Sequence, residues 1–113
     1  WEARNNYIHV VLDPHRAAEQ FFQQNARRSL NSANQVRALS LLEMQHNALL
    51  MYTSCGWFFD ELSGIETVQV IQYAGRAAQL AAELFGDSLE KQFVDRLATA
   101  RSNIAEQGDG RRI

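Results

Sequence analysis

The middle of the chain holds the side chains best suited to chemistry. Segment 52–64, YTSCGWFFDELSG, is the richest in aromatic residues and contains the adjacent carboxylates Asp60 and Glu61. An aromatic face supplies apolar area and a carboxylate accepts strong hydrogen bonds, so together they can hold a sugar hydroxyl. Adjacent carboxylates point apart, so this pair does not by itself form the two groups, about 5–10 Å apart, that flank a glycosidic bond. The residue types therefore allow one carboxylate beside the Trp57 ring to hold a sugar hydroxyl, without a catalytic pair.

The same loop also has a purely structural interpretation. Trp57, Phe58 and Phe59 cannot all face water at low cost, so part of this run is expected to be buried. In that case the aromatic rings fasten the loop to the helices, and Asp60 or Glu61 caps the next turn. The residue types leave both interpretations open.

A second group of chemically capable residues is Glu43 and His46, which have the Glu-x-x-His spacing of di-iron bundles. Such bundles need a second motif, and neither His9 nor His15 has a glutamate three residues before it. Three interpretations remain: a metal site, a buried histidine with a hydrogen-bond partner, and a polar wall beside a substrate cleft. We expect no metal and no cofactor.

Hydrophobic periodicity predicts an all-α bundle of about five helices that would position these residues. The third helix is apolar on both sides in its second half, and the fourth has only a narrow polar side, so we expect them to form a buried central hairpin. The aromatic and acidic loop then lies at the tip of this hairpin. The predicted helices span about 1–12, 14–28, 33–53, 66–85 and 88–107.

Capping residues separate these helices. An Asp-Pro pair suits an N-cap followed by a first helical residue, Ser or Asp with Glu or Gln three residues later suits a capping box, and glycine suits a left-handed C-cap. The corresponding residues are Asp13-Pro14, Ser32 with Gln35, Gly56, Gly86, and Asp87 with Glu90.

Composition limits the class of protein. The 113 residues fit one domain, expected over 1–107, with a flexible tail at 108–113. The net charge is −2 and the arginines are scattered, so we expect no nucleic-acid partner. No apolar stretch is long enough for a membrane span. The lone Cys55 excludes an internal disulfide and suits a reducing compartment, so we expect a small buried thiol and a cytoplasmic protein. Because the chain opens at Trp1 inside a helical pattern, we expect a fragment of a longer protein.

The loop and its flanks also carry a family resemblance. Segments 41–45 (LLEMQ), 51–67 (MYTSCGWFFDELSGIET) and 68–74 (VQVIQYA) resemble a helical region of unknown function. That region follows the catalytic domain in bacterial and archaeal proteins similar to glycoside hydrolase family 57. The resemblance covers the central half of the chain, and the flanking helices add little to it.

The resemblance implies a role in a carbohydrate-active protein. Family-57 enzymes act on α-linked glucans with retention, using a glutamate and an aspartate in a partial β/α barrel. This chain has no alternating strands, so no catalytic residue carries over and no hydrolysis by this chain alone is expected. The implied function is a non-catalytic accessory domain that packs on the barrel and helps to line its α-glucan site. The implied substrate-binding residues are Trp57, with Asp60, Glu61 and His46.

The rival prediction is a structural or interaction bundle without a ligand, in which Trp57 is fully buried and has no open pocket beside it. A domain built to cover a barrel should instead expose an apolar patch, or form a homodimer that hides one.

Overall fold

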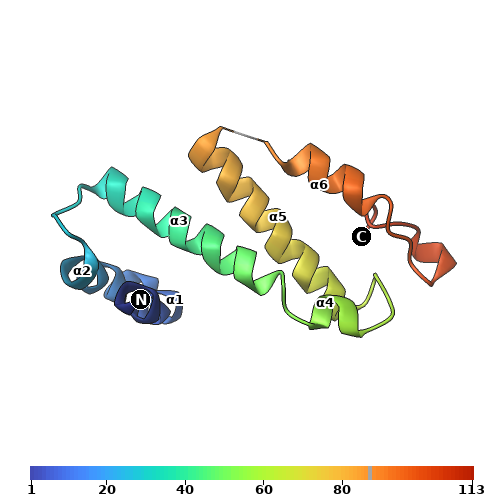
Figure 1. Ribbon diagram of the computed structural model, residues 1–113, viewed down its shortest axis with the longest axis horizontal. Helices are drawn as coiled ribbons and strands as arrows, with labels where there is room; N and C mark the ends of the chain where they lie inside the picture. Colours follow the sequence, from blue (N-terminus) through green and yellow to red (C-terminus); the bar gives the residue numbers. More distant parts are fainter. Residues whose placement is uncertain (87) are drawn as a thin grey trace. The chain divides into compact units, whose positions relative to one another are not determined.

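The computed structural model describes residues 1–86 and 88–113, and within these ranges it contains helices and no strand (Figure 1). Five of its helices have eight residues or more, which confirms the predicted all-α bundle of about five helices. A single-turn helix, α4 (Cys55–Phe58), and a 3₁₀ turn, η1 (Ala105–Gln107), complete the description. The longer helices are α1 (Glu2–Leu12), α2 (Pro14–Asn25), α3 (Ser32–Leu50), α5 (Ile65–Phe85) and α6 (Glu90–Leu97).

The chain divides into two compact units, Trp1–Leu42 and Glu43–Ile113, where the sequence predicts one domain over 1–107. The first unit is built on α1 and α2, which pack against each other. Its core consists of Val10, Phe21 and Phe22. The Phe21 ring lies edge-on to Tyr7 at 6.1 Å and to Phe22 at 5.4 Å between ring centroids, an arrangement that aromatic rings prefer.

The joint between α1 and α2 follows the sequence prediction. Asp13 is the N-cap of α2, where its Oδ1 accepts a hydrogen bond from the Arg16 N–H at 3.3 Å, and Pro14 is the first helical residue. The helix ends at Asn25, three residues before the predicted Arg28. The Asn25 side-chain amide donates to the Phe21 carbonyl at 2.9 Å, a local bond of the kind that competes with helix continuation.

The start of α3 corrects the predicted capping box at Ser32. Asn31 provides the cap, because its Oδ1 accepts a hydrogen bond from the Asn34 N–H at 2.9 Å. The Gln35 side chain donates to the Leu30 carbonyl at 3.1 Å. Ser32 is the first residue of the helix.

In the second unit, α5 matches its predicted range of 66–85 to within one residue. Gly64 is its N-cap, and Gly86 ends it in the left-handed conformation with φ 79°, as predicted. The predicted capping box at Asp87 lies outside the described residues.

The α3–α5 hairpin is much less buried than predicted. No residue of α3 is buried, and within α5 only Thr67 and Leu80 are. Leu49 at the end of α3 is 69% exposed, and Ile65 at the start of α5 is 80% exposed. Both helices therefore leave part of their apolar surface in contact with solvent.

The segment after α6 differs most from its prediction. The helix ends at Leu97 rather than near Gln107, and the Thr99 hydroxyl donates to the Arg96 carbonyl at 2.7 Å. The chain then doubles back. The Gly110 N–H donates to the Ala100 carbonyl at 3.0 Å, and Arg101 and Asp109 form an antiparallel bridge. Residues 108–110 of the predicted flexible tail, 108–113, therefore pair with the residues that follow α6.

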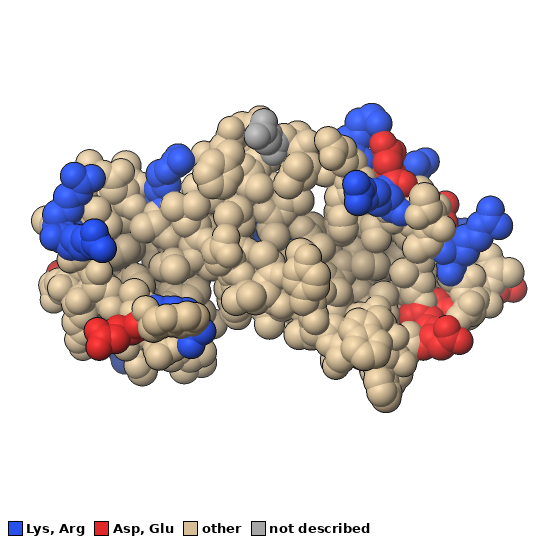
Figure 2. Space-filling view, in the orientation of Figure 1, with Lys and Arg blue, Asp and Glu red and all other residues tan. Residues whose placement is uncertain are grey.

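Charge is mixed over the visible surface. Figure 2 shows basic and acidic side chains interleaved in the region of α6 and the C-terminal segment, and uncharged side chains over α4. Lys91 and Arg111 both pair with Asp95, at 2.7 and 3.6 Å. Among the helices described, none has the length and apolar character needed to cross a membrane.

Candidate functional site

The aromatic run of the loop faces solvent. The side chains of Trp57, Phe58 and Phe59 are 74%, 70% and 47% exposed. Phe58 and Phe59 pack edge-to-face with 5.2 Å between ring centroids, so each ring shields part of the other. The prediction that part of this run must be buried is wrong for the described chain.

The backbone beneath these rings is tightly placed. The Ser54 carbonyl accepts hydrogen bonds from the N–H groups of Trp57 and Phe58 at 3.1 and 2.8 Å, which closes the single turn of α4. Gly56 lies in this turn against α5, where an added Cβ would lie 2.9 Å from Val70 Cγ1. Gly56 is therefore a close-packing glycine, and the predicted left-handed C-cap is wrong, because its φ is not positive.

Glu61 holds the end of the loop. Its Oε1 accepts hydrogen bonds from the Ser63 N–H and hydroxyl, both at 2.7 Å, and from the Ser102 hydroxyl at 2.6 Å. Its Oε2 accepts from the Asn103 N–H at 2.9 Å. The Asn103 side chain also donates to the Asp60 carbonyl. One carboxylate thus joins the loop to the segment after α6.

This network stabilises the charged form of Glu61. The Ser102 hydroxyl, followed by the N–H and hydroxyl of Ser63, lowers the pKa of the Glu61 carboxyl from its ordinary 4.5 to about 2. Hydrogen bonds to a carboxylate favour ionisation because they are made to the charged form. Both oxygens already have partners within the chain, so the carboxylate acts as an anchor.

Replacing Glu61 with glutamine is expected to remove a pH-dependent part of the stability. Because the folded pKa of about 2 lies below the ordinary 4.5, the anchor stabilises the fold above pH 4.5 and is lost as pH falls toward 2. Urea unfolding should show Glu61→Gln less stable than the parent chain near neutral pH and equally stable at about pH 2. Asp60→Asn, which removes the adjacent charge, is the control and should change little. An unchanged gap between parent and Glu61→Gln at both pH values would contradict the anchor.

An open cleft of about 360 Å³ lies beside the loop, between the end of α3 and the start of α5. Cys55 reaches this cleft and is exposed, which corrects the expectation of a buried thiol. None of the four predicted substrate-binding residues lines it. Its lining is Leu50, Thr53, Cys55, Ile65, Glu66, Gln69, Val70 and Tyr73.

The Glu43 and His46 pair lies on α3. Glu43 Oε1 accepts a hydrogen bond from Arg76 Nε of α5 at 2.8 Å, and this bond raises the pKa of the Arg76 guanidinium. His46 is half-buried and already has an interaction partner. The metal hypothesis requires further ligands near this pair, and the described residues contain no group of three or more potential ligands. Glu43 therefore links two helices through an ion pair.

Of the four predicted site residues, Trp57 lies in α4, Asp60 and Glu61 follow it in the same loop, and His46 lies on α3. The sequence analysis missed Ser102 and Asn103, which position the loop from about 40 residues away. Their only local signal is a short Arg-Ser-Asn run inside a segment interpreted as helix, where Ser and Asn are poor helix formers.

Comparison with known proteins gives one result. No curated protein and no solved structure is significantly similar to the chain. A family model described as a domain of unknown function, DUF3536, matches residues 1–113. The chain therefore belongs to the DUF3536 family.

Proposed function

We propose that this chain is a non-catalytic helical accessory domain of a family-57-like glycoside hydrolase or glucanotransferase. It packs against the catalytic barrel of its parent protein in the cytoplasm, and Trp57 contacts the α-glucan. The partner and the substrate come from the resemblance of segments 41–45 and 51–74 to the helical region of such proteins.

The observation that carries the proposal is the exposed aromatic run on an anchored loop. Trp57 and Phe58 are each at least 70% exposed, while Glu61 ties the loop to the segment after α6 through two hydrogen bonds, from the Ser102 hydroxyl and the Asn103 N–H. Large apolar side chains that remain exposed together mark a surface that binds another molecule. An anchored loop presents such a surface with less loss of conformational freedom on binding.

Apolar residues that flank the loop in the sequence are also exposed. Tyr52 before α4 and Ile65 after the loop are also strongly exposed, and Phe59 adds a further ring. The rival structural bundle predicts a fully buried Trp57 without an open pocket nearby. The exposure of Trp57 and the cleft at Cys55 favour the accessory domain over that rival.

Tryptophan fluorescence tests the glycan contact. In a Trp1→Phe variant Trp57 is the only tryptophan. Its emission is expected to be red and quenchable, since the side chain faces water, and to shift in a saturable way with malto-oligosaccharides. Trp57→Phe, which retains Trp1, is the matched control and should show no shift.

Self-association is separated from ligand binding in the same experiment. In the isolated chain the apolar surface is proposed to pair two copies, which would move Trp57 emission to the blue as protein concentration rises. The titration is therefore repeated at several protein concentrations. Blue, unquenchable emission at every concentration with no response to glycan would leave only the structural rival.

A further inference from the structure

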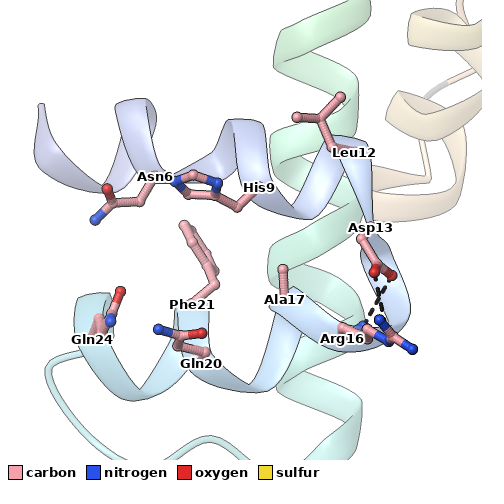
Figure 3. A pocket seen from close by; sticks show the side chains of 9 residues that line it. All are labelled: Asn6, His9, Leu12, Asp13, Arg16, Ala17, Gln20, Phe21 and Gln24. Atoms are coloured by element: carbon pink, nitrogen blue, oxygen red, sulfur yellow. Dashed lines mark hydrogen bonds and ion pairs between the residues drawn. The ribbon is translucent and has the colours of Figure 1, made fainter.

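A second cleft, in the first unit, lies between α1 and α2 and is not part of the proposed function. Its volume of about 510 Å³ falls within the range of small-molecule sites, about 300–1,000 Å³. Figure 3 shows Asn6 and His9 extending from α1, with Gln20, Phe21 and Gln24 on α2 along the other side.

The polar side chains of this cleft have unused hydrogen-bonding capacity. Within the described chain, His9, Gln20 and Gln24 make no side-chain hydrogen bond. The Asn6 amide donates to Asn25 Oδ1 at 3.3 Å, which holds its position and leaves its carbonyl oxygen facing other partners. A primary amide both donates and accepts, as does a neutral imidazole. The cleft therefore offers several two-way hydrogen-bonding groups.

The charge in the cleft is balanced. The carboxylate and the guanidinium of its lining, Asp13 and Arg16, pair with each other at 3.9 Å between Oδ2 and Nε. The dashed lines in Figure 3 join these two residues. The lining thus carries no net charge that would attract an ion. Its accessible apolar part comes from Leu12, which is exposed, and Ala17, which gives the hydrocarbon side of a ligand a surface to contact, while Phe21 forms the buried floor.

We propose that this cleft binds a neutral polyhydroxylated ligand of the sugar class. Hydroxyl groups donate and accept hydrogen bonds, as the amides of Gln20 and Gln24 and the imidazole of His9 require. The C–H face of the ligand lies against Leu12 and Ala17. A charged ligand is disfavoured, because it would lose hydration without gaining an opposite charge.

Two-dimensional ¹H–¹⁵N NMR of the full chain tests this proposal with maltose as the neutral probe and glucose 6-phosphate as the charged one. The side-chain NH₂ signals of Asn6, Gln20 and Gln24 report directly on the cleft, and the Trp57 indole N–H reports on the loop. The expected result is a saturable movement of the cleft signals with maltose and a weaker one with glucose 6-phosphate.

Matched substitutions on α2 test the residues. Replacing Gln20 and Gln24 together with alanine should weaken maltose binding about tenfold, as expected for the loss of two ligand hydrogen bonds. Gln23→Ala is the control, since Gln23 bonds to Glu19 at 3.3 Å and does not line the cleft. All three residues are exposed, so the fold should persist.

Several outcomes would overturn the cleft site: no movement of its signals with maltose, equal movement with both probes, or equal loss in Gln23→Ala. Movement of the Trp57 indole alone would overturn the cleft and support the loop of the proposed function. Movement of the cleft signals alone would support the cleft and count against the glycan contact at Trp57.

Discussion

Replacing Phe22 with alanine is expected to lower the free energy of unfolding by about 3–5 kcal/mol. Phe22 is buried with Val10 and Phe21 in the core of the first unit, and its ring meets Phe21 at 5.4 Å between centroids. Removing the Phe22 ring leaves a cavity in this core, which α1 and α2 form by packing against each other. Domains have total stabilities of only about 5–15 kcal/mol, so this loss removes a large fraction of the stability.

Urea unfolding followed by circular dichroism measures this loss, and Phe58→Ala is the matched control. Phe58 carries the same side chain but is exposed, so its removal should change stability by less than about 0.5 kcal/mol. A loss at Phe58 as large as at Phe22 would mean that the α4 rings are core residues in solution. That result would also remove the observation on which the proposed function rests.

Two glycine-to-alanine substitutions are expected to have opposite effects. Gly110 is buried where the C-terminal segment meets the end of α6, and an added Cβ would lie 2.5 Å from the Leu97 carbonyl oxygen. Backbone must shift to accommodate it, so Gly110→Ala should lose about 1–3 kcal/mol. Gly75 lies inside α5 with no atom within 4 Å of an added Cβ. Alanine has the higher helix propensity, so Gly75→Ala should gain about 0.5–1 kcal/mol.

Thermal unfolding of both variants beside the parent chain gives the two signs in one experiment. The shift of Gly110 should also break the hydrogen bond from its N–H to the Ala100 carbonyl, and with it the position of Ser102 beneath Glu61. Gly110→Ala is therefore expected to lose part of the pH dependence assigned to Glu61. A Gly110→Ala chain as stable as its parent would show that the C-terminal segment does not pack as described.

Local sequence signals predicted most of the helices. Asp13-Pro14 and Gly86 fixed two joints correctly, because a proline and a left-handed glycine act through the backbone of their own segment. The signals failed where two neighbouring residues could each cap the same helix. Asn31 rather than Ser32 caps α3, and both residue types are good caps.

Hydrophobic periodicity could not predict contacts between segments that are distant in the sequence. The apolar stripe after Leu89 fits a long helix, but the segment beyond Thr99 pairs with residues 108–110. That pairing depends on Gly110, whose lack of a side chain lets two backbones approach. Nothing within one helical window carries this information.

The sequence indicated the aromatic loop as the candidate site, but not the role of each residue in it. The density of aromatic residues identified the loop around Trp57, and the structure places these rings on its surface. Glu61 was predicted as a substrate-binding residue, and its carboxylate is occupied by Ser63, Ser102 and Asn103. An acidic residue beside an aromatic run has the same sequence signature whether its partner is a ligand or a distant serine.

The anchor of the aromatic loop has a consequence for synthesis. Glu61 and its partner Ser102 are 41 residues apart, so a ribosome adding about 5–20 residues per second completes the loop roughly 2–8 seconds before its anchor. During that interval the nascent chain carries three aromatic rings on a loop whose Glu61 carboxylate has only its Ser63 partner. We expect chaperones that recognise apolar segments to bind there first, and to release the segment once Ser102 and Asn103 emerge.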